Sequence, residues 1–238
     1  TQSNESYEKE CRNIDALIQT QVDGIIASMA NETIKLGHYK KIISKGIPLV
    51  LFDRGEDELE VDYVGIDDYE TSHLIVDHLV DKKCKRIAHI AGFKHKRIYK
   101  NRLIGFKDAL KKHNLPIDED QIIESNLMIE DGRRIMKQLL DSPNRPDAVY
   151  AAGDYAALGA LQILLEENIK VPEEIALVGF SNETFTSLTS PSISTVDQHS
   201  EKMGQLAAKA LLNRLEKTNE KEAVNIVNLK PELIIRAS

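Results

Sequence analysis

Three aspartates that follow two predicted strands could bind a metal ion. Asp53 comes directly after the apolar run PLVLF, and Asp67 and Asp68 come after the run YVGI. Carboxylates from neighbouring strand ends could hold a divalent cation, as an enzyme acting on a phosphorylated or glycosidic substrate would require. Such a site needs further carboxylates or a lysine, and no other candidate lies near. The competing interpretation is a solvated turn whose aspartate caps a helix that begins at Tyr69.

A basic run offers a second kind of chemistry. The segment KHKRIYKNR follows a predicted strand and precedes the helical segment LIGFKDALKK, and its cations are Lys94, Lys96, Arg97, Lys100 and Arg102. Basic runs are typical of nucleic-acid contacts or of a solvated face. This position also brings at least one cation to the mouth of a cleft, where a forked guanidinium can bind hydroxyls, a carboxylate or a phosphate. We expect Arg102 to have that role and the other four to be solvated.

The familiar catalytic and cofactor motifs do not occur. The sequence has no GxGxxG, GxxxxGK[ST], GxSxG, HExxH or CxxC pattern, which argues against dinucleotides and nucleoside triphosphates. Cys11 and Cys84 are far apart; a bridge between them is an alternative, but we expect free thiols. We therefore predict no catalytic residue, no metal site and no cofactor.

The elements that would position these side chains alternate along the chain. Short apolar runs alternate with amphipathic helical segments, which is the pattern of parallel βαβ units. The predicted strands are 24–28, 48–52, 63–66, 86–91, 121–125, 148–152, 175–180 and 192–196. The predicted helices are 5–19, 69–81, 154–168 (with Asp154 as N-cap) and about 201–215, and the tail contains two short strands hinged near Pro231.

Polar residues follow most of these strands. They are Ser28, Asp53, Asp67, Lys94, Asp154, Ser181 with Asn182, and Asp197 with Gln198. Because ligands of open parallel sheets bind beyond the carboxyl ends of the strands, this set predicts a hydrogen-bonding cleft for a polar small molecule. At any single position a helix cap or a turn is the favoured explanation, and the prediction rests on the whole set.

Composition limits the possible partners. The chain has 238 residues, of which 42% are hydrophobic and 29% charged, and a net charge of −7. It is therefore long enough for a sizeable core, and as a whole it lacks the basic footprint of a DNA-binding protein. No apolar stretch approaches the ~20 residues that cross a bilayer, and the first ten residues do not resemble a signal peptide.

Several blocks together resemble the effector-binding core of LacI/GalR-type bacterial transcription regulators and, more distantly, periplasmic sugar-binding proteins. The blocks keep the family's order and spacing over nearly the whole chain. They are VDGIIAS (22–28), IPLVLFDR (47–54), VGIDDYETSHLIVDHL (64–79), RIAHIAG (86–92), NRLIGF (101–106), AVYAAGDYAALGAL (148–161) and IALVGFSNETFTSLTSPSISTVDQ (175–198).

The resemblance implies two similar α/β lobes with parallel sheets, joined by three crossovers, with an effector between them. On this sequence lobe one is 1–91 plus 196–220, and lobe two is 92–195 plus 221–238. The crossovers are expected near Gly92, near Thr195 and near the start of the tail. The family's first strand and helix of lobe one, and its helix-turn-helix head, are expected to be absent from this chain.

The resemblance also assigns effector-binding residues. Arg102 matches the family's effector-contacting arginine, and Ser181, beside Asn182, stands where many members have an aspartate. The remaining matches are Leu127 (often an aromatic that stacks on the ligand), Asp154 with Gly153, the hinge-side Gln198 and Ser200, and Glu70 on lobe one. Serine for aspartate and leucine for an aromatic both argue against a neutral monosaccharide held in the usual way.

The predicted function is effector sensing by a cytoplasmic LacI-type regulator, with no enzymatic activity and no membrane contact. The effector is expected to be a sugar or sugar derivative, and operator DNA to be bound through the head that this chain lacks. A homodimer is expected, with residues 69–81 and 32–45 at its interface. Two alternatives remain: a periplasmic sugar-binding receptor of a transporter, and the metal-dependent enzyme built on Asp53, Asp67 and Asp68. We also expect removal of Arg102 to abolish effector binding and leave the fold intact.

Overall fold

The computed structural model describes residues 1–216 and 223–238, and the chain divides into two compact units. Unit 1 comprises Thr1–Ile66 and His199–Lys230, and unit 2 comprises Asp67–Gln198 and Pro231–Ser238. Each unit contains a four-stranded parallel sheet with helices packed against it. The predicted fold class, an α/β protein with two parallel-sheet lobes, is confirmed.

The boundaries of the two units differ from those predicted for the two lobes. Residues 67–91 were expected in lobe one, but they belong to unit 2. The physical reason is that the strand Ile87–Gly92 pairs with two strands of the second sheet, and the helix before it packs on another helix of unit 2. The second crossover, between Gln198 and His199, lies close to the predicted one at Thr195. The predicted change at 220/221 lies outside the described residues; the chain returns to unit 2 at Pro231.

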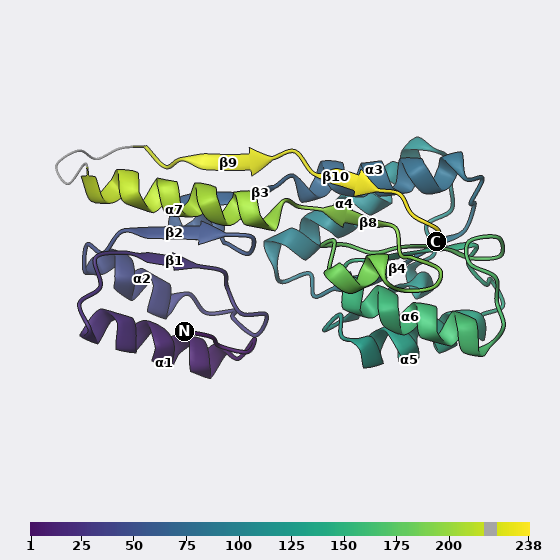
Figure 1. The fold of residues 1–238 in the computed structure, drawn as a ribbon, viewed down its shortest axis with the longest axis horizontal. Coiled ribbons are helices and arrows are strands. Elements are labelled where there is room, and N and C mark those ends of the chain that lie inside the picture. Colours follow the sequence, from purple (N-terminus) through teal and green to yellow (C-terminus); the bar gives the residue numbers. More distant parts are fainter. Residues whose placement is uncertain (217–222) are drawn as a thin grey trace. The chain divides into compact units, whose positions relative to one another are not determined.

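Unit 1 is a three-layer arrangement. Its parallel strands run in the order β1-β2-β3-β9, so β1 is an edge strand. Helices α1 and α2 lie on one side of the sheet and α7 on the other (Figure 1). The elements are α1 (Tyr7–Gln19), β1 (Ile25–Ala27), α2 (Gly37–Ser44), β2 (Leu49–Phe52), a 3₁₀ turn (Asp57–Leu59), β3 (Asp62–Ile66), α7 (Ser200–Glu216) and β9 (Ile226–Leu229).

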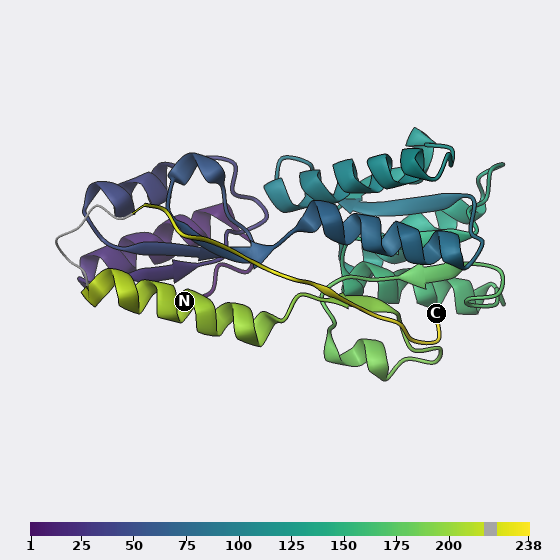
Figure 2. The ribbon, with the colours of Figure 1, turned by 90° about the horizontal axis from the view of Figure 1, so that it is seen from above.

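Unit 2 repeats the plan around a sheet with the order β5-β4-β6-β7. Helices α3 and α4 pack together against one face, and α5 and α6 against the other (Figures 1 and 2). The elements are α3 (Asp68–Asp81), β4 (Ile87–Gly92), α4 (Arg97–Lys112), a 3₁₀ turn (Glu119–Gln121), β5 (Ile122–Ser125), α5 (Ile129–Leu140), β6 (Ala148–Ala151), α6 (Asp154–Glu166), β7 (Ala176–Val178), a 3₁₀ turn (Thr184–Ser187), β8 (Thr195–Asp197) and β10 (Glu232–Ile234).

Helices α5 and α6 approach each other closely because small residues face one another. A Cβ atom on Gly132 would lie 2.0 Å from the Ala156 carbonyl oxygen, and one on Gly159 would lie 2.0 Å from that of Ile129. These helices and the strands β4, β6 and β7 supply most of the apolar core of unit 2. The result is a rigid sheet that fixes where the carboxyl ends of its strands lie.

The tail forms the two short strands predicted on either side of Pro231. Strand β9 extends the sheet of unit 1, and β10 pairs antiparallel with β8 in unit 2. Beyond β10, the Ser238 hydroxyl donates to the Leu177 carbonyl at 2.5 Å and accepts from the Ser194 amide at 2.8 Å. The C-terminal residues are thereby attached to the last strands of unit 2.

Along residues 1–216 and 223–238, every helix is too short or too polar to traverse a lipid bilayer.

Candidate functional site

The carboxyl ends of the parallel strands of unit 2 bring most of the predicted effector residues to one edge of the sheet. Leu127 follows β5, Asp154 follows β6, and Ser181 and Asn182 follow β7. In a parallel sheet all strands end at the same edge. Arg102, in the second turn of α4, comes from the helix that follows β4 and contacts this edge at the Ala152 carbonyl. Unit 2 therefore carries five of the seven predicted residues at the carboxyl edge of its sheet.

Arg102 is held in a buried and fixed position. Its side chain is 4% exposed, and its Nε donates to the Asp68 carboxylate at 2.7 Å. Its Nη1 donates to the Ala152 carbonyl at 2.9 Å. The guanidinium carbon lies 3.4 Å from the centroid of the Phe180 ring and 5.4 Å from that of Tyr99. The structure gives Nη2 no hydrogen bond to any described residue, which leaves this nitrogen able to donate to a ligand.

The charge of Arg102 is secured by its neighbours. Burial alone would lower the pKa of this guanidinium, but the Asp68 carboxylate beside it raises that pKa above its ordinary value. The Arg102 guanidinium is therefore a permanently charged donor in a fixed orientation. Such a donor binds an acceptor atom at a defined position better than a flexible lysine or arginine on the surface does. The same burial argues against our expectation that removal of Arg102 leaves the fold intact, because the side chain lies between α3, the strand end after β6 and two aromatic rings.

Asp154 supports the loop after β7 and does not cap α6 as predicted. The N-cap of α6 is Gly153, and Asp154 is the first residue of the helix. Its Oδ2 accepts from the Glu183 amide at 2.8 Å, and its Oδ1 accepts from the Thr195 hydroxyl at 2.7 Å. Burial raises the pKa of this carboxyl, although those hydrogen bonds oppose the shift. Both oxygens are engaged within unit 2, so they hold the loop in place.

Ser181 and Asn182 adopt backbone conformations that non-glycine residues rarely take, with φ of 120° and 54°. The Ser181 amide donates to the Val196 carbonyl at 3.0 Å, while no hydrogen bond of its hydroxyl is recorded among the described residues. The Asn182 side-chain oxygen accepts from Arg236 at 2.7 Å. Of the two, Ser181 therefore keeps its side chain available for a ligand, and Asn182 offers at most its amide nitrogen.

Leu127 and Glu70 are less suited to the predicted roles. Leu127 is 8% exposed and belongs to the apolar core cluster, so it presents little surface to a stacked ligand. Glu70 is exposed and lies on α3 in unit 2, although it was predicted on lobe one. Its amide donates to the side chain of Asp67, which caps α3.

Gln198 is the last residue of unit 2 before the second crossover. Its Oε1 is buried and has no hydrogen-bond partner in the described part of the chain. A buried amide oxygen without a partner is costly unless a ligand or water satisfies it. Ser200, the other predicted hinge-side residue, begins α7 in unit 1 and is exposed.

The aspartates considered for metal binding have other roles. Asp67 caps α3 by accepting from the Glu70 amide at 3.0 Å, as the turn interpretation predicts. Asp68 is engaged by Arg102, and Asp53, in unit 1, accepts from the Ser28 hydroxyl at 3.4 Å. Among residues 1–216 and 223–238, no three His, Cys, Asp or Glu side chains are grouped so that they could hold a metal ion.

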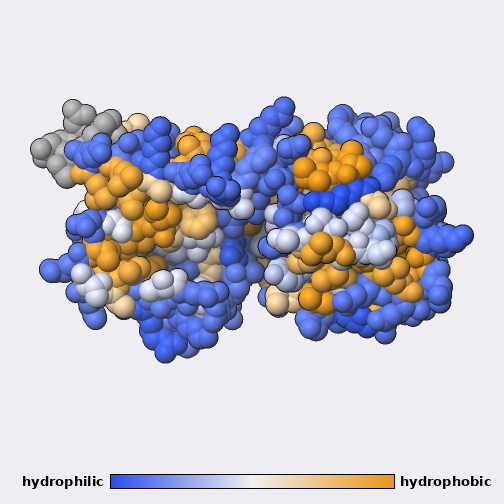
Figure 3. All heavy atoms as spheres, viewed as in Figure 1, coloured by the Kyte–Doolittle hydropathy of each residue, from blue (hydrophilic) through white to orange (hydrophobic). Residues whose placement is uncertain are grey.

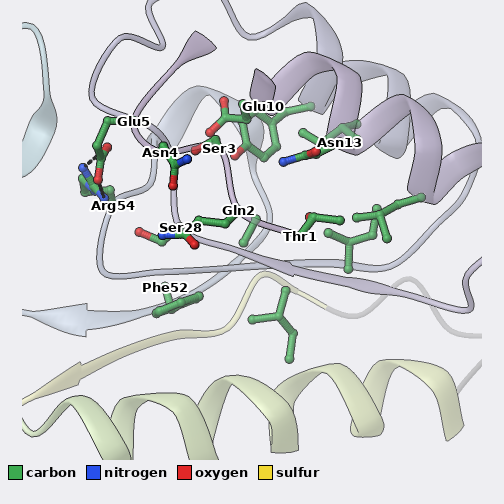
Figure 4. Close-up of a pocket in the computed structure, with 16 residues that line it drawn as sticks. Thr1, Gln2, Ser3, Asn4, Glu5, Glu10, Asn13, Ser28, Phe52 and Arg54 are labelled. Atoms are coloured by element: carbon green, nitrogen blue, oxygen red, sulfur yellow. Dashed lines mark hydrogen bonds and ion pairs between the residues drawn. The ribbon is translucent and has the colours of Figure 1, made fainter. Parts of the chain in front are cut away.

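A separate cavity of about 340 Å³ lies in unit 1 beside the edge strand β1. The N-terminal segment 1–5, α1 and β1 line it, and an ion pair between Glu5 and Arg54 (2.7 Å) stands at its border (Figure 4). Apolar side chains gather on the face of unit 1 shown in Figure 3. Two large apolar residues of β1 and α7 are exposed, Ile26 at 38% and Leu212 at 59%. None of the predicted effector residues lines this cavity.

Sequence reasoning missed four residues that build the site. Asp68 was considered only as a metal ligand, whereas it orients Arg102. Tyr99 and Phe180 stack on the guanidinium, and Arg236 binds Asn182. The adjacency of Asp68 to a strand end was a signal that could have been used; no sequence pattern pointed to Arg236.

Comparisons with known proteins agree with this architecture. A family model described as a periplasmic binding protein-like domain matches residues 76–238. The HTH-type transcriptional repressor PurR of Pasteurella multocida (strain Pm70) is 33% identical over 239 residues, covering 100% of this chain and 70% of the relative. The transcription regulator CcpA of Lactococcus lactis matches with a TM-score of 0.92 and 25% identity, covering 100% of this chain and 86% of that structure. A transcriptional regulator CelR–cellobiose complex matches with a TM-score of 0.88 and 29% identity, covering 98% and 71% of the two chains.

Proposed function

Because this chain belongs to the LacI/GalR family of transcriptional regulators, whose effector-binding domain it represents, we propose that it senses a small polar effector, a sugar or sugar derivative, and couples effector binding to operator recognition. The effector binds at the carboxyl ends of β4 to β7 in unit 2. Operator DNA is bound by a helix-turn-helix head elsewhere in the regulator, which acts in the cytoplasm.

The observation that carries this proposal is the fixed guanidinium of Arg102. Asp68 and the Ala152 carbonyl orient it, and Phe180 covers one of its faces. A buried cation that retains donor capacity at the ligand edge of a parallel sheet suits an effector with acceptor oxygens. Ser181 adds a hydroxyl, which can donate to or accept from a sugar hydroxyl.

One of the solved structures similar to this chain is a complex with cellobiose, and it supports a carbohydrate-type effector. The loop after β7 departs from a simple sugar clamp, because Ser181 has no carboxylate with which to accept from two neighbouring hydroxyls. We therefore expect a sugar derivative that carries an acceptor-rich group, such as a carboxylate or a phosphate, to bind better than the parent sugar.

Coupling to DNA requires that the effector binds one arrangement of the protein better than another. Three crossings of the chain join units 1 and 2, at Ile66–Asp67, Gln198–His199 and Lys230–Pro231. We propose a homodimer with a two-fold interface that includes residues 69–81 and 32–45, because a palindromic operator matches two-fold protein symmetry.

A thermal-shift screen of the intact protein tests the proposal. The panel comprises glucose, cellobiose, gluconate, glucose 6-phosphate and hypoxanthine. A ligand at a hundred times its Kd stabilises the folded state by about 2.7 kcal/mol, which is readily detected. We expect the acidic sugars to raise Tm more than glucose does. A panel without any effect on Tm would contradict the proposal.

Two serine variants locate the binding site. Ser181→Ala should reduce the ligand-induced rise in Tm, because it removes the hydroxyl that the loop offers to the effector. Ser187→Ala is the matched control, since that exposed serine lies on the same loop and donates to the Thr184 carbonyl. An equal rise in both variants would show that the effector binds elsewhere.

A further inference from the structure

The loop Ser181–Leu188, which we call the effector loop, begins with two residues whose backbone conformations need stabilising contacts from other parts of the protein. Ser181 and Asn182 both have positive φ, at 120° and 54°. Strained non-glycine residues persist only where surrounding contacts over-determine them. The contacts that hold this loop are therefore part of how it presents Ser181.

One side of the loop is fixed by Asp154 and the strand β8. Asp154 accepts from the Glu183 amide (2.8 Å) and from the Thr195 hydroxyl (2.7 Å). The Thr195 hydroxyl oxygen in turn accepts from the Asn182 amide at 3.2 Å. These contacts fix the backbone of the loop, but they leave the side chain of Asn182 undetermined.

The other side of the loop is fixed by a single arginine from the tail. The Nη2 of Arg236 donates to the Asn182 side-chain oxygen at 2.7 Å, and its Nη1 donates to the Thr186 hydroxyl at 3.1 Å and to the Ile193 carbonyl at 2.8 Å. A guanidinium can only donate, so the Asn182 amide must turn its oxygen toward Arg236. Arg236 thus joins Asn182 at the beginning of the loop and Thr186 within it to Ile193, which lies between the loop and β8.

The same arginine is rigidly attached to the crossover strands. It lies two residues after β10, and its amide donates to the Ser194 hydroxyl at 3.0 Å. Strand β10 pairs with β8 through Glu232–Asp197, Leu233–Val196 and Ile234–Thr195. Strand β8 leads directly into the crossing at Gln198, and β10 begins just after the crossing at Pro231.

We propose that Arg236 is a positioning residue, which holds the effector loop in its strained conformation and ties it to the two crossover strands. This inference rests on the proposed function in taking Ser181 as an effector contact. A change in the loop on binding is then transmitted through Arg236 to β8 and β10, which are the segments that connect the two units. It also fixes the Asn182 amide nitrogen as the only part of that side chain able to meet a ligand.

Hydrogen exchange of the intact, ligand-free protein, followed by mass spectrometry, tests the inference. Arg236→Met keeps an unbranched side chain of adequate length and removes every side-chain donor. We expect exchange of the amides in 181–188 to accelerate about tenfold and that of 192–198 to accelerate as well, while the α5 peptide 129–140 is unchanged. Arg236→Lys, which retains a donor, should restore part of the protection. The matched control is Arg134→Met, which removes an exposed arginine from α5 and should leave 181–188 unchanged.

A double-mutant cycle separates positioning from a general effect on stability. Asn182→Ala should accelerate exchange of the loop amides. In the double variant with Arg236→Met, the acceleration should be smaller than the product of the two single accelerations, because both changes break the same Arg236–Asn182 hydrogen bond. A uniform acceleration over unit 2, a change confined to 231–238, or fully multiplicative effects would each overturn the inference. Because no effector is present, this result is independent of the thermal-shift screen, and either one can fail alone.

Discussion

Replacing Arg102 by methionine should do more than abolish effector binding; it should destabilise unit 2. The change removes a cation that Asp68 contacts at 2.7 Å, and both side chains of this pair are only 4% exposed. A carboxylate at this depth has little access to water that could replace the arginine. Methionine preserves the unbranched stem and much of the volume, so the result reports on charge and hydrogen bonds more than on a cavity.

The size of the effect follows from the burial. Removing one partner of a buried ion pair typically costs about 3–5 kcal/mol, and we expect the free energy of unfolding to fall by an amount in this range. The lost cation–π contact with Phe180 at 3.4 Å adds about 1 kcal/mol, and a favourable contact between the methionine sulfur and the same ring returns a similar amount. We therefore expect a loss of about 4 kcal/mol, which is a large fraction of the stability of an ordinary domain.

Urea denaturation of the intact protein, followed by circular dichroism, measures this loss. The double variant Asp68→Asn/Arg102→Met should recover at least half of it, because it also removes the buried negative charge. Arg133→Met is the matched control; its pair with Glu166 has side chains 35% and 51% exposed, and a solvated pair of this kind contributes little to stability. If Arg102→Met costs no more than this control, the charge pair is not what stabilises the site.

Two further predictions concern packing and pH. Gly159→Ala should lower the free energy of unfolding, measured by urea denaturation, by about 2 kcal/mol or more, because the added Cβ would lie 2.0 Å from the Ile129 carbonyl oxygen. The control Gly204→Ala adds a Cβ in open space within α7 and should raise that free energy by about 0.5–1 kcal/mol. Equal effects of the two changes would show that α5 and α6 can move apart. Burial lowers the pKa of His89 from 6.5 to about 4, although its hydrogen bond to the Tyr150 carbonyl opposes the shift. The unfolded chain therefore binds the proton first as the pH falls, and the histidine's contribution should fall by about 2 kcal/mol between pH 7 and pH 5 and be lost below pH 4. The pH dependence of urea denaturation should be weaker by that amount in His89→Gln, and an unchanged dependence would show that His89 is not buried as a neutral ring.

Much of the fold could be predicted because the sequence pattern is local. Runs such as 86–91 and 148–152 are nearly continuously apolar, which is typical of strands covered by helices on both faces, and they form β4 and β6. The helix predicted at 69–81 corresponds to α3 at Asp68–Asp81. The strand ends also indicated the edge of the sheet to which most of the predicted effector residues are brought, without knowledge of long-range contacts.

The boundary between the units was not predictable in the same way. It depends on which sheet the strand after α3 joins, and β4 pairs with β5 and β6, both of which come later in the sequence. A strand pattern does not encode its partners, so residues 67–91 were placed in the wrong lobe. The role of Arg236 was hidden for the same reason, since Asn182 lies 54 residues before it.

The polar strand ends that first suggested a binding cleft are mostly the scaffold of the site. Asp67 caps α3, Asp154 supports the effector loop, and Asn182 is turned toward Arg236. Asp67, Asp68 and Asp154 are thus engaged by partners inside unit 2, and the donors left for an effector include the Arg102 Nη2 and the hydroxyl of Ser181. A site that supplies these donors while those carboxylates are engaged discriminates by the acceptors that a ligand carries. Specificity in this regulator should therefore follow the acidic or carbonyl groups of the effector, with its hydroxyl pattern of secondary importance on the unit 2 side.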